Sequence, residues 1–543
     1  MTAPPGAGLA RSRAAGQPAR QEEFLAAYPA YRRTAVLDRL RAGEYGYLDA
    51  QAQVYLDYTG AGLPARAQVA AHADRLAGGC FGNPHSENPT SAASTELIER
   101  ARRRVLEHFS APPDEYAAIF TANATAACRI VAEAYPFGPR SRLVVTCDNH
   151  NSVNGIREFA RARGAATEYV PFGPPGLRVS DEAVTAALDR PGPAVATAAA
   201  TAVRSGVAPW AGRGPRARRQ RALARKWAQD PRRSVAGLAG GPPQRRRGLF
   251  AYPAQSNFTG VQHPLGWIET AHDRGYDVLL DAAAFVPANP LDLSVVKPDF
   301  VPVSWYKVFG YPTGVGCLIA RREALARLWR PWFSGGTINA VSVQGDWHVL
   351  AGDEARFEDG TLNFLNIPDL EFGLSWVSSV GVDVIHERVR CLTAWMLGRL
   401  AALRHSGGEP VALIYGPSGP GGRGGTIAFN LLDPHGRIVD ERAVARDTAA
   451  AGISIRTGCF CNPGAGEGAF GITRDHVVRA FRDRARTVDE YLESLGLPSG
   501  GAIRASVGIA SNLADVERFL SFIEETYRDR PAEAAGLAPR LRC

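Results

Sequence analysis

Short apolar runs alternate with amphipathic segments along the first two thirds of the chain. Apolar runs of four to six residues predict buried strands at residues 116–121, 142–146, 249–252, 276–281 and 300–304. Residues 94–109 and 126–134 carry apolar side chains at helical spacing and predict helices between strands. Strands that are apolar on both faces and alternate with helices are typical of an α/β fold with a mainly parallel sheet.

The pattern changes near residue 380 and predicts a second, smaller α+β domain. Helices are predicted at residues 386–403, 439–451 and 514–527, with strands at 411–415 and 426–430. Near the N-terminus, residues 22–42 predict one helix. We therefore expect four parts, namely a tail and helix (1–45), a large domain (46–380), a small domain (381–530) and a tail (531–543).

Composition is that of an ordinary globular protein. Hydrophobic residues make up 45% of the 543 residues and charged residues 21%. No apolar run reaches the roughly 18 residues that a membrane span requires. The first 20 residues lack the apolar core of a secretory signal. The eight cysteines of so long a chain do not indicate a disulfide framework, so we expect a reducing, cytoplasmic environment.

Lysine is rare in this chain, and one lysine follows a predicted strand. Only Lys226, Lys297 and Lys307 are lysines among 62 basic residues, and the others are arginine. Arginine cannot offer a neutral amine, whereas a buried lysine can form a Schiff base. Lys307 follows the strand at 300–304 and precedes a glycine turn, which predicts an amine where ligands bind open α/β sheets. The alternative is a surface lysine.

Other candidate residues also follow predicted strands. Asp281 ends an apolar strand, where an ionised carboxylate needs a partner such as a pyridinium nitrogen. Thr125 lies in a small-residue turn before a helix, a pattern typical of phosphate sites. His150 follows another strand and by itself is as consistent with a loop residue. Cys459 and Cys461 have the spacing of metal ligands, but no second pair at zinc spacing accompanies them.

A strongly basic segment interrupts the predicted large domain. Residues 204–247 contain thirteen basic residues and one acidic residue, whereas the net charge of the whole chain is only +8. Such a segment can bind nucleic acid, but Trp210 and Trp227 are its only aromatic residues, so it lacks an interleaved aromatic platform. A solvated insertion, or a stretch read in the wrong frame, is the interpretation we favour over a nucleic-acid site.

Taken together, ordered motifs resemble the class V aminotransferase-fold enzymes that use pyridoxal phosphate (PLP). Within that group the chain is similar to the N-terminal sulfurase domain of the molybdenum cofactor sulfurases. The stretches that carry the resemblance are Tyr55–Asp57, Gly82–Ser86, Asp148–His150, Tyr252–Gly260, Ser304–Gly310, Phe357–Thr361 and Arg456–Gly464. The resemblance implies fold type I, with a seven-stranded sheet in the large domain and a homodimer.

The resemblance also implies roles for individual residues in cofactor binding. Lys307 would bind PLP covalently, Asp281 would pair with the pyridine nitrogen, and His150 would stack on the ring. Asn257 would lie near the phenolic oxygen of the cofactor. The residues implied to hold the phosphate are Thr125, Ser304 and, from the second subunit, Thr337.

Substrate residues follow from the same resemblance. Arg504, with Arg456 nearby, would bind the substrate carboxylate, and Cys461 would accept sulfur as a persulfide. Gly466 stands where the family usually has a third cysteine. We expect residues 528–543 to be only a tail, without the family's C-terminal molybdenum-cofactor-binding domain.

We therefore predict a PLP-dependent cysteine desulfurase or sulfurase that converts L-cysteine to L-alanine. The sulfur acceptor is left open between molybdenum cofactor, a carrier protein and another precursor. Within the enzymes, the alternative is a PLP-dependent lyase, transaminase or epimerase acting on another amino acid. The alternative that is not an enzyme is a scaffold or nucleic-acid binder that uses the arginine-rich segment. Cys461 favours desulfuration, because the alternative reactions need no thiol.

Overall fold

A computed structural model describes most of the chain. The described residues are 18–84, 86–173, 176–192, 246–482 and 500–532, together with 490, 492, 494, 495, 497 and 537. The arginine-rich segment predicted at 204–247 lies outside the described residues except for Arg246 and Arg247, and so does most of the N-terminal tail.

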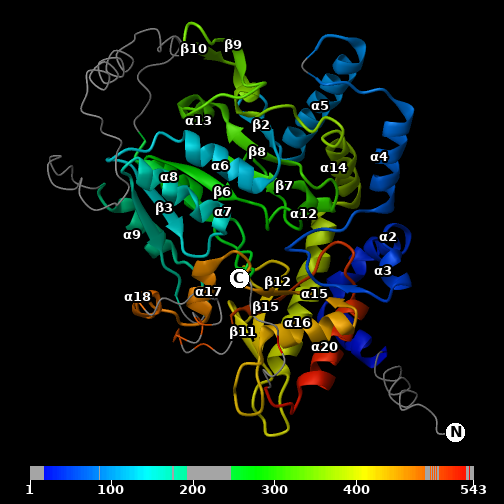
Figure 1. Ribbon diagram of the computed structural model, residues 1–543. Helices are drawn as coiled ribbons and strands as arrows, with labels where there is room; N and C mark the ends of the chain where they lie inside the picture. The colour runs from blue at the N-terminus through cyan, green and yellow to red at the C-terminus, as the bar shows by residue number, and fades with distance from the viewer. Residues whose placement is uncertain are drawn as a thin grey trace.

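The core of the fold is a seven-stranded sheet (Figure 1). Its strand order is β2-β8-β7-β6-β5-β3-β4, in which β8 is antiparallel to both neighbours and the other pairs are parallel. The strands are β2 (Tyr116–Thr121), β3 (Arg142–Thr146), β4 (Ala166–Val170), β5 (Gly248–Pro253), β6 (Tyr276–Asp281), β7 (Phe300–Ser304) and β8 (Gly316–Arg321). This confirms the predicted α/β class and its mainly parallel sheet.

Both faces of the central strands are buried, as their unbroken apolar runs require. Leu143 and Leu249 face one core cluster, which includes Val131 of α6 (Ala124–Ala134). Val144 and Phe250 face a second cluster, which includes Val105 of α5 (Pro89–His108). Because neighbouring residues of a strand point to opposite faces, the two clusters form the two layers beside the sheet.

Lys307 lies in a single helical turn that follows β7. The turn is α12 (Trp305–Phe309), and Gly310 ends it with φ of +78°. A side chain at Gly310 would meet the backbone of Leu63 at 2.1 Å, so glycine is required both for the conformation and for the close approach. The sequence predicted the strand and the glycine turn but not the helical turn between them.

The second sheet lies in the C-terminal part of the chain. Its four antiparallel strands have the order β11-β12-β15-β14. They are β11 (Ala412–Tyr415), β12 (Thr426–Leu431), β15 (Ala502–Ser506) and β14 (Arg456–Gly458), with helices α15 (Val382–Ala402), α16 (Glu441–Ala450) and α20 (Leu513–Tyr527). Near the N-terminus, β1 (Val54–Tyr55) pairs with β13 (Ile453–Ser454), which places Asp57 beside Ser506 of this sheet.

The helix predicted over residues 22–42 is wrong as a single element. Residues 18–27 are helical, a 3₁₀ helix spans Pro29–Thr34, and α2 spans Val36–Glu44. Pro29 has no backbone N–H and disfavours helical geometry at Tyr28, whose φ and ψ are −129° and 66°. The chain therefore leaves helical geometry at Tyr28, whereas Ala35, between the 3₁₀ helix and α2, keeps helical φ and ψ of −58° and −21°.

The remaining elements surround these two sheets (Figure 1). They are α3 (Tyr47–Ala50), α4 (Arg66–Gly78), α7 (Asn151–Asn154), α8 (Ile156–Ala162), α9 (Asp181–Asp189), α11 (Trp267–Asp273), α13 (Arg322–Arg327), β9 (Ile338–Ser342), β10 (Trp347–Leu350), η3 (Asp353–Phe357), α14 (Asp369–Val380), α17 (Pro463–Ala469) and α18 (Arg474–Arg482). Among the described residues, no helix combines the length and apolar character needed to cross a membrane.

Candidate active site

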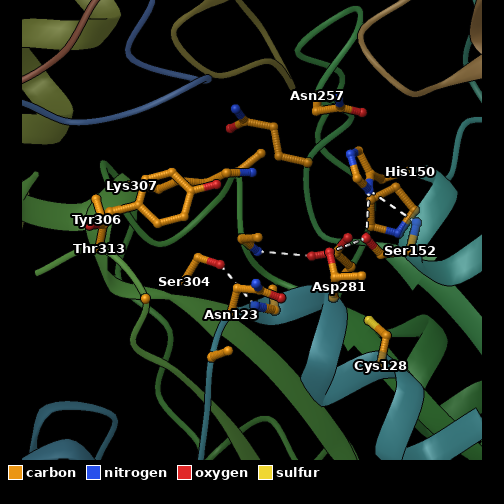
Figure 2. Close-up of a pocket in the computed structure, with 18 residues that line it drawn as sticks. Asn123, Cys128, His150, Ser152, Asn257, Asp281, Ser304, Tyr306, Lys307 and Thr313 are labelled. Atoms are coloured by element: carbon orange, nitrogen blue, oxygen red, sulfur yellow. Dashed lines mark hydrogen bonds between the residues drawn. The ribbon is translucent and has the colours of Figure 1, made fainter. Parts of the chain in front are cut away.

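A cavity of about 380 Å³ opens at the carboxyl ends of the central strands. Its walls come from the loop after β3, the ends of β6 and β7, and the start of α6. Figure 2 shows Asp281 in the middle of the labelled side chains, with His150 on one side and Lys307 on the other. Ligand sites of open α/β sheets lie at this edge, because the loops there diverge.

Lys307 is a buried amine. Burial lowers the pKa of this amine below its usual value of 10.5, and the nearby Arg504 lowers it further, whereas Asp281 raises it. In the described part of the chain, no carboxylate lies within ion-pair distance of Lys307. The lowered pKa increases the fraction of neutral amine, which is the nucleophilic form.

Asp281 is a buried carboxylate at the end of β6. Its Oδ1 accepts a hydrogen bond of 3.0 Å from the backbone N–H of Ala283. None of the cationic side chains that the structure describes forms an ion pair with it. A buried carboxylate without a cationic partner is costly, so this site favours a ligand that brings a positive charge or an N–H donor.

His150 is held beside Asp281 by two hydroxyl groups. Its Nδ1 lies 2.9 Å from Ser152 Oγ, which lies 2.7 Å from Thr125 Oγ1 (Figure 2). Burial lowers the pKa of the imidazole, although Asp281 opposes the shift. The imidazole is therefore neutral at neutral pH. The hydrogen bond between Nδ1 and Ser152 Oγ fixes the orientation of the ring.

The start of α6 forms one end of the cavity. Asn123 caps this helix through a bond from the backbone N–H of Ala126, and Ser304 Oγ accepts from the backbone N–H of Ala124 at 2.9 Å. A helix N-terminus with neighbouring hydroxyl groups favours a phosphate. A side chain at Gly316 would meet the backbone of Asn123 at 2.6 Å, so glycine in β8 allows this close approach.

Two arginines meet at one carboxylate beside the cavity. Arg504 NH2 lies 2.9 Å from Asp57 Oδ1, and Arg456 NH2 lies 2.6 Å from Asp57 Oδ2. Arg504 also donates to the backbone oxygen of Asn257 at 2.9 Å. Burial lowers the pKa of Arg504, whereas the hydrogen bond to Asp57 raises the pKa of Arg456.

The loop that carries Cys461 is tied to the cavity wall. Asn257 Nδ2 donates to the backbone oxygen of Phe460 at 2.8 Å, and Asn462 Nδ2 donates to Asn257 Oδ1 at 2.9 Å. The backbone N–H of Asn151 donates to the oxygen of Cys461 at 2.7 Å. Phe460 is buried while Cys461 is exposed, and both have left-handed φ values of 54° and 53°. Residues other than glycine rarely adopt this conformation, which is typical of functional loops.

Comparison with known proteins identifies the family of this fold and site. The family model described as "Aminotransferase class-V" matches residues 54–223 and 244–519. The chain belongs to the class V aminotransferase family. The gap in this match, residues 224–243, falls within the arginine-rich segment.

Two curated relatives of this class V chain are molybdenum cofactor sulfurases. The chain is 35% identical over 511 residues to the molybdenum cofactor sulfurase of Bos taurus, covering 90% of this chain and 52% of that protein. It is 33% identical over 543 residues to the molybdenum cofactor sulfurase of Solanum lycopersicum, covering 96% of this chain and 61% of that protein. The chain thus spans little more than half the length of these relatives.

Solved structures share the class V fold. A cysteine desulfurase from Thermococcus onnurineus NA1 has a TM-score of 0.66 at 21% identity, covering 90% of this chain and 97% of that chain. The cysteine desulfurase CsdA from Escherichia coli has a TM-score of 0.62 at 20% identity, covering 90% of this chain and 98% of that chain. These similarities confirm the predicted fold type I architecture.

The cofactor of this class V protein is pyridoxal phosphate, and the cavity fits it. The buried carboxylate of Asp281 suits a protonated ring nitrogen, and the neutral imidazole of His150 offers a flat surface. The buried amine of Lys307 suits the aldehyde. The capped start of α6, with Thr125 and Ser304, suits the phosphate.

The structure brings together most of the residues predicted for the site. Thr125, His150, Asn257, Asp281, Ser304 and Lys307 all line the cavity. Arg504 and Arg456 lie beside it on Asp57, and Cys461 lies on a loop bonded to its wall. Thr337 is not among the residues that line the cavity of its own chain, and its hydroxyl bonds within the turn to Ser334.

Several residues of the site had no predicted role. Ser152 links His150 to Thr125, Asn462 links the Cys461 loop to Asn257, and Asp57 holds both arginines. Asp57 and Asn462 lie inside motifs that carried the resemblance, but their spacing gave no signal of a partner. The partners of Asp57 are 399 and 447 residues away, beyond any local pattern.

Proposed function

We propose that this class V protein is a cysteine desulfurase, or sulfurase, that converts L-cysteine to L-alanine and holds the released sulfur as a persulfide on Cys461. The observation that carries the proposal is an exposed thiol on a loop bonded to the cofactor cavity. The names of the curated relatives and of the similar structures support the same reaction class. The alternative lyase, transaminase and epimerase reactions give no role to this thiol.

Residues of the cavity would hold the cofactor and the substrate. Lys307 would bind the aldehyde, Asp281 would pair with the ring nitrogen, and His150 would stack on the ring. Asn257 would lie near the phenolic oxygen, and Thr125 and Ser304 would bind the phosphate. Bound pyridoxal phosphate withdraws electrons from the amino acid and so weakens its bonds near the α-carbon.

The side chains of this protein would perform the remaining steps. Arg504, with Arg456 nearby, would bind the substrate carboxylate with charge-assisted hydrogen bonds. The Cys461 thiolate would attack the sulfur of the bound cysteine. The carbon–sulfur bond would break, its electron pair would stay with the carbon, and protonation of that carbon would give the methyl group of alanine. His150 and Lys307 both line the cavity. Either side chain would move the protons that these steps require.

We further propose that the enzyme is a homodimer and that Thr337 of a second copy completes the phosphate site. The hairpin of β9 and β10 supports this, because it exposes Val341, Val343, Trp347 and Val349. In Figure 1 the hairpin projects from the edge of the molecule. Sedimentation would show a dimer, and charged substitutions at Val343 and Trp347 would produce a monomer with weaker PLP binding.

The domain division, compartment and acceptor complete the proposal. The large domain (46–380) would carry the cofactor site, and the small domain (381–530) would supply Arg504 and Cys461. We place the enzyme in the cytoplasm, since the eight cysteines of so long a chain do not indicate a disulfide framework. The molybdenum cofactor is the first acceptor to test, because the curated relatives are named for it.

The decisive experiment measures alanine and persulfide formed from L-cysteine by the purified, PLP-loaded protein. Cys461→Ala and Lys307→Ala serve as matched variants. The proposal expects alanine from the wild type and none from either variant, with PLP still bound by Cys461→Ala. A PLP-loaded wild type that forms no alanine from cysteine would contradict the proposal and favour a different amino-acid substrate.

A further inference from the structure

Arg504, which is proposed to bind the substrate carboxylate, and its neighbour Arg456 are not free in this structure. Asp57 bridges them, with Oδ1 toward Arg504 at 2.9 Å and Oδ2 toward Arg456 at 2.6 Å. Asp57 is itself fixed, because its backbone pairs with Ser506 and its side chain is largely buried. A carboxylate of the protein thus occupies donors that a substrate carboxylate would use.

The two contacts of Asp57 differ in strength. Arg456 directs both Nε, at 2.9 Å, and NH2, at 2.6 Å, toward Asp57 Oδ2. Arg504 contributes only one bond, from NH2 at 2.9 Å, while its NH1 donates to the Asn257 backbone. Two charge-assisted donors hold a carboxylate more strongly than one. The bond to Arg504 is therefore the one that a competing carboxylate displaces first.

Burial explains why Arg504 needs such a partner. Its side chain is only 3% exposed, and its Nε has no hydrogen-bond partner among the described residues. A buried guanidinium without an anion is costly, and burial already lowers its pKa. Arg456, in contrast, is half exposed and can be solvated. Arg504 consequently has the greater need for a carboxylate, and its Nε is a second donor for one.

Gly60 shows how tightly this arrangement is packed. A side chain at Gly60 would meet Asp57 Oδ2 at 2.5 Å and Arg456 NH2 at 2.7 Å. The turn after β1 is thus shaped around the Asp57–Arg456 pair. This pair is built into the fold, whereas Arg504 keeps a buried Nε that has no hydrogen-bond partner among the described residues.

We propose that Asp57 is a built-in competitor that occupies Arg504 in the empty site and yields it to the carboxylate of the substrate. On binding, Asp57 keeps its two bonds to Arg456, and Arg504 turns its NH2 and Nε donors to the ligand. Only an anionic group can replace Asp57 without leaving the buried guanidinium unpaired, so a ligand without a carboxylate leaves the Asp57–Arg504 bond in place. The inference rests on the proposed function only in taking an amino acid as the ligand.

The test is the affinity of the PLP-loaded protein for L-alanine, measured by calorimetric titration. Asp57→Asn keeps the shape and removes the competing charge. We expect L-alanine to bind on the order of tenfold more tightly to this variant, because one charge-assisted bond no longer has to be broken. L-alaninamide, which lacks the carboxylate, should gain nothing. A residue that only supports the fold would weaken binding when replaced, so unchanged or weaker L-alanine binding overturns the proposal.

A double-mutant cycle with Arg456→Gln provides a second test. In our proposal Arg456 holds Asp57 away from the ligand, so Arg456→Gln alone should weaken L-alanine binding about tenfold. That loss should vanish when Asp57→Asn is also present, because no competitor remains. If the loss persists in the double variant, Arg456 binds the ligand directly and the proposal is wrong. Circular dichroism of each variant confirms that it is folded.

These outcomes separate the inference from the proposed function. Alanine formation from L-cysteine is assayed on the same samples. A wild type that binds L-alanine but forms none from cysteine contradicts the proposed function and leaves the Asp57 exchange supported by its own titrations. Active protein whose Asp57→Asn variant binds L-alanine no more tightly contradicts the Asp57 exchange alone.

Discussion

The side-chain amides of Asn257 and Asn462 are joined by a hydrogen bond of 2.9 Å between the cavity wall and the Cys461 loop. Asn257 uses its other amide atom to hold the backbone oxygen of Phe460 at 2.8 Å. Asn462 also donates to the backbone oxygen of Asp148 at 2.6 Å, two residues before His150. One pair of amides therefore sets the position of the thiol relative to the cofactor cavity.

Asn462→Ala should impair alanine formation from cysteine more than it impairs PLP binding. Misplacing a reacting group by about 1 Å costs up to roughly 100-fold in rate, so we expect kcat to fall about 10- to 100-fold. Absorbance of the bound cofactor checks that PLP remains. Asn512→Ala is the matched control, since Asn512 caps α20 and not the Cys461 loop and should affect only stability. Equal activity of both variants would show that the amide pair does not position Cys461.

Phe460→Ala should loosen the same loop by removing its buried anchor. The Phe460 ring is 7% exposed, lies 5.1 Å from the Phe258 ring and lies under the Arg504 guanidinium at 4.7 Å. Loss of a buried phenylalanine costs about 3–5 kcal/mol, and a loop that relaxes would reduce this. We expect lower thermal stability and faster alkylation of Cys461 by iodoacetamide. An unchanged alkylation rate would mean that hydrogen bonds alone hold the loop.

Gly316→Ala should weaken the phosphate end of the cavity. The added methyl group would meet the Asn123 backbone at 2.6 Å and the Val303 oxygen at 2.7 Å, so the start of α6 must move. We expect at least about tenfold weaker PLP binding, because the backbone donors at a helix N-terminus are lost together. Gly398→Ala, where nothing lies within 4 Å of the new methyl group, is the control. Fluorescence titration of the cofactor-free protein with PLP measures both.

The rate of PLP uptake by cofactor-free protein should depend on pH through Lys307. Burial lowers the pKa of its amine below 10.5, so the neutral, reactive form is populated at a lower pH than in an exposed lysine. Uptake should therefore rise with pH, with a midpoint below pH 10.5. Asp281→Asn should move the midpoint lower still, because Asp281 raises this pKa. A midpoint near that of a free lysine would contradict the burial argument, and stopped-flow absorbance measures it.

The central sheet could be predicted because its pattern is local. The runs at 116–121, 142–146, 276–281 and 300–304 correspond residue for residue to β2, β3, β6 and β7. Their side chains are apolar on both faces, and only a sheet covered on both sides buries them all. The prediction of one helix over 22–42 was wrong because it followed the apolar spacing and gave too little weight to Pro29. In the folded chain this proline breaks the helix.

The amino-acid sequence by itself determined which chemical groups are available. They are a lysine in a chain that uses arginine for nearly all of its positive charge, a carboxylate at the end of a buried strand, and a thiol in a glycine-rich loop. Only the tertiary structure decided which of these groups meet. Asp57 reaches Arg456 and Arg504 across 399 and 447 residues of sequence, and Asn257 reaches Asn462 across 205. Such contacts have no periodic pattern, because they arise only when two sheets pack together and bring their loops to one edge.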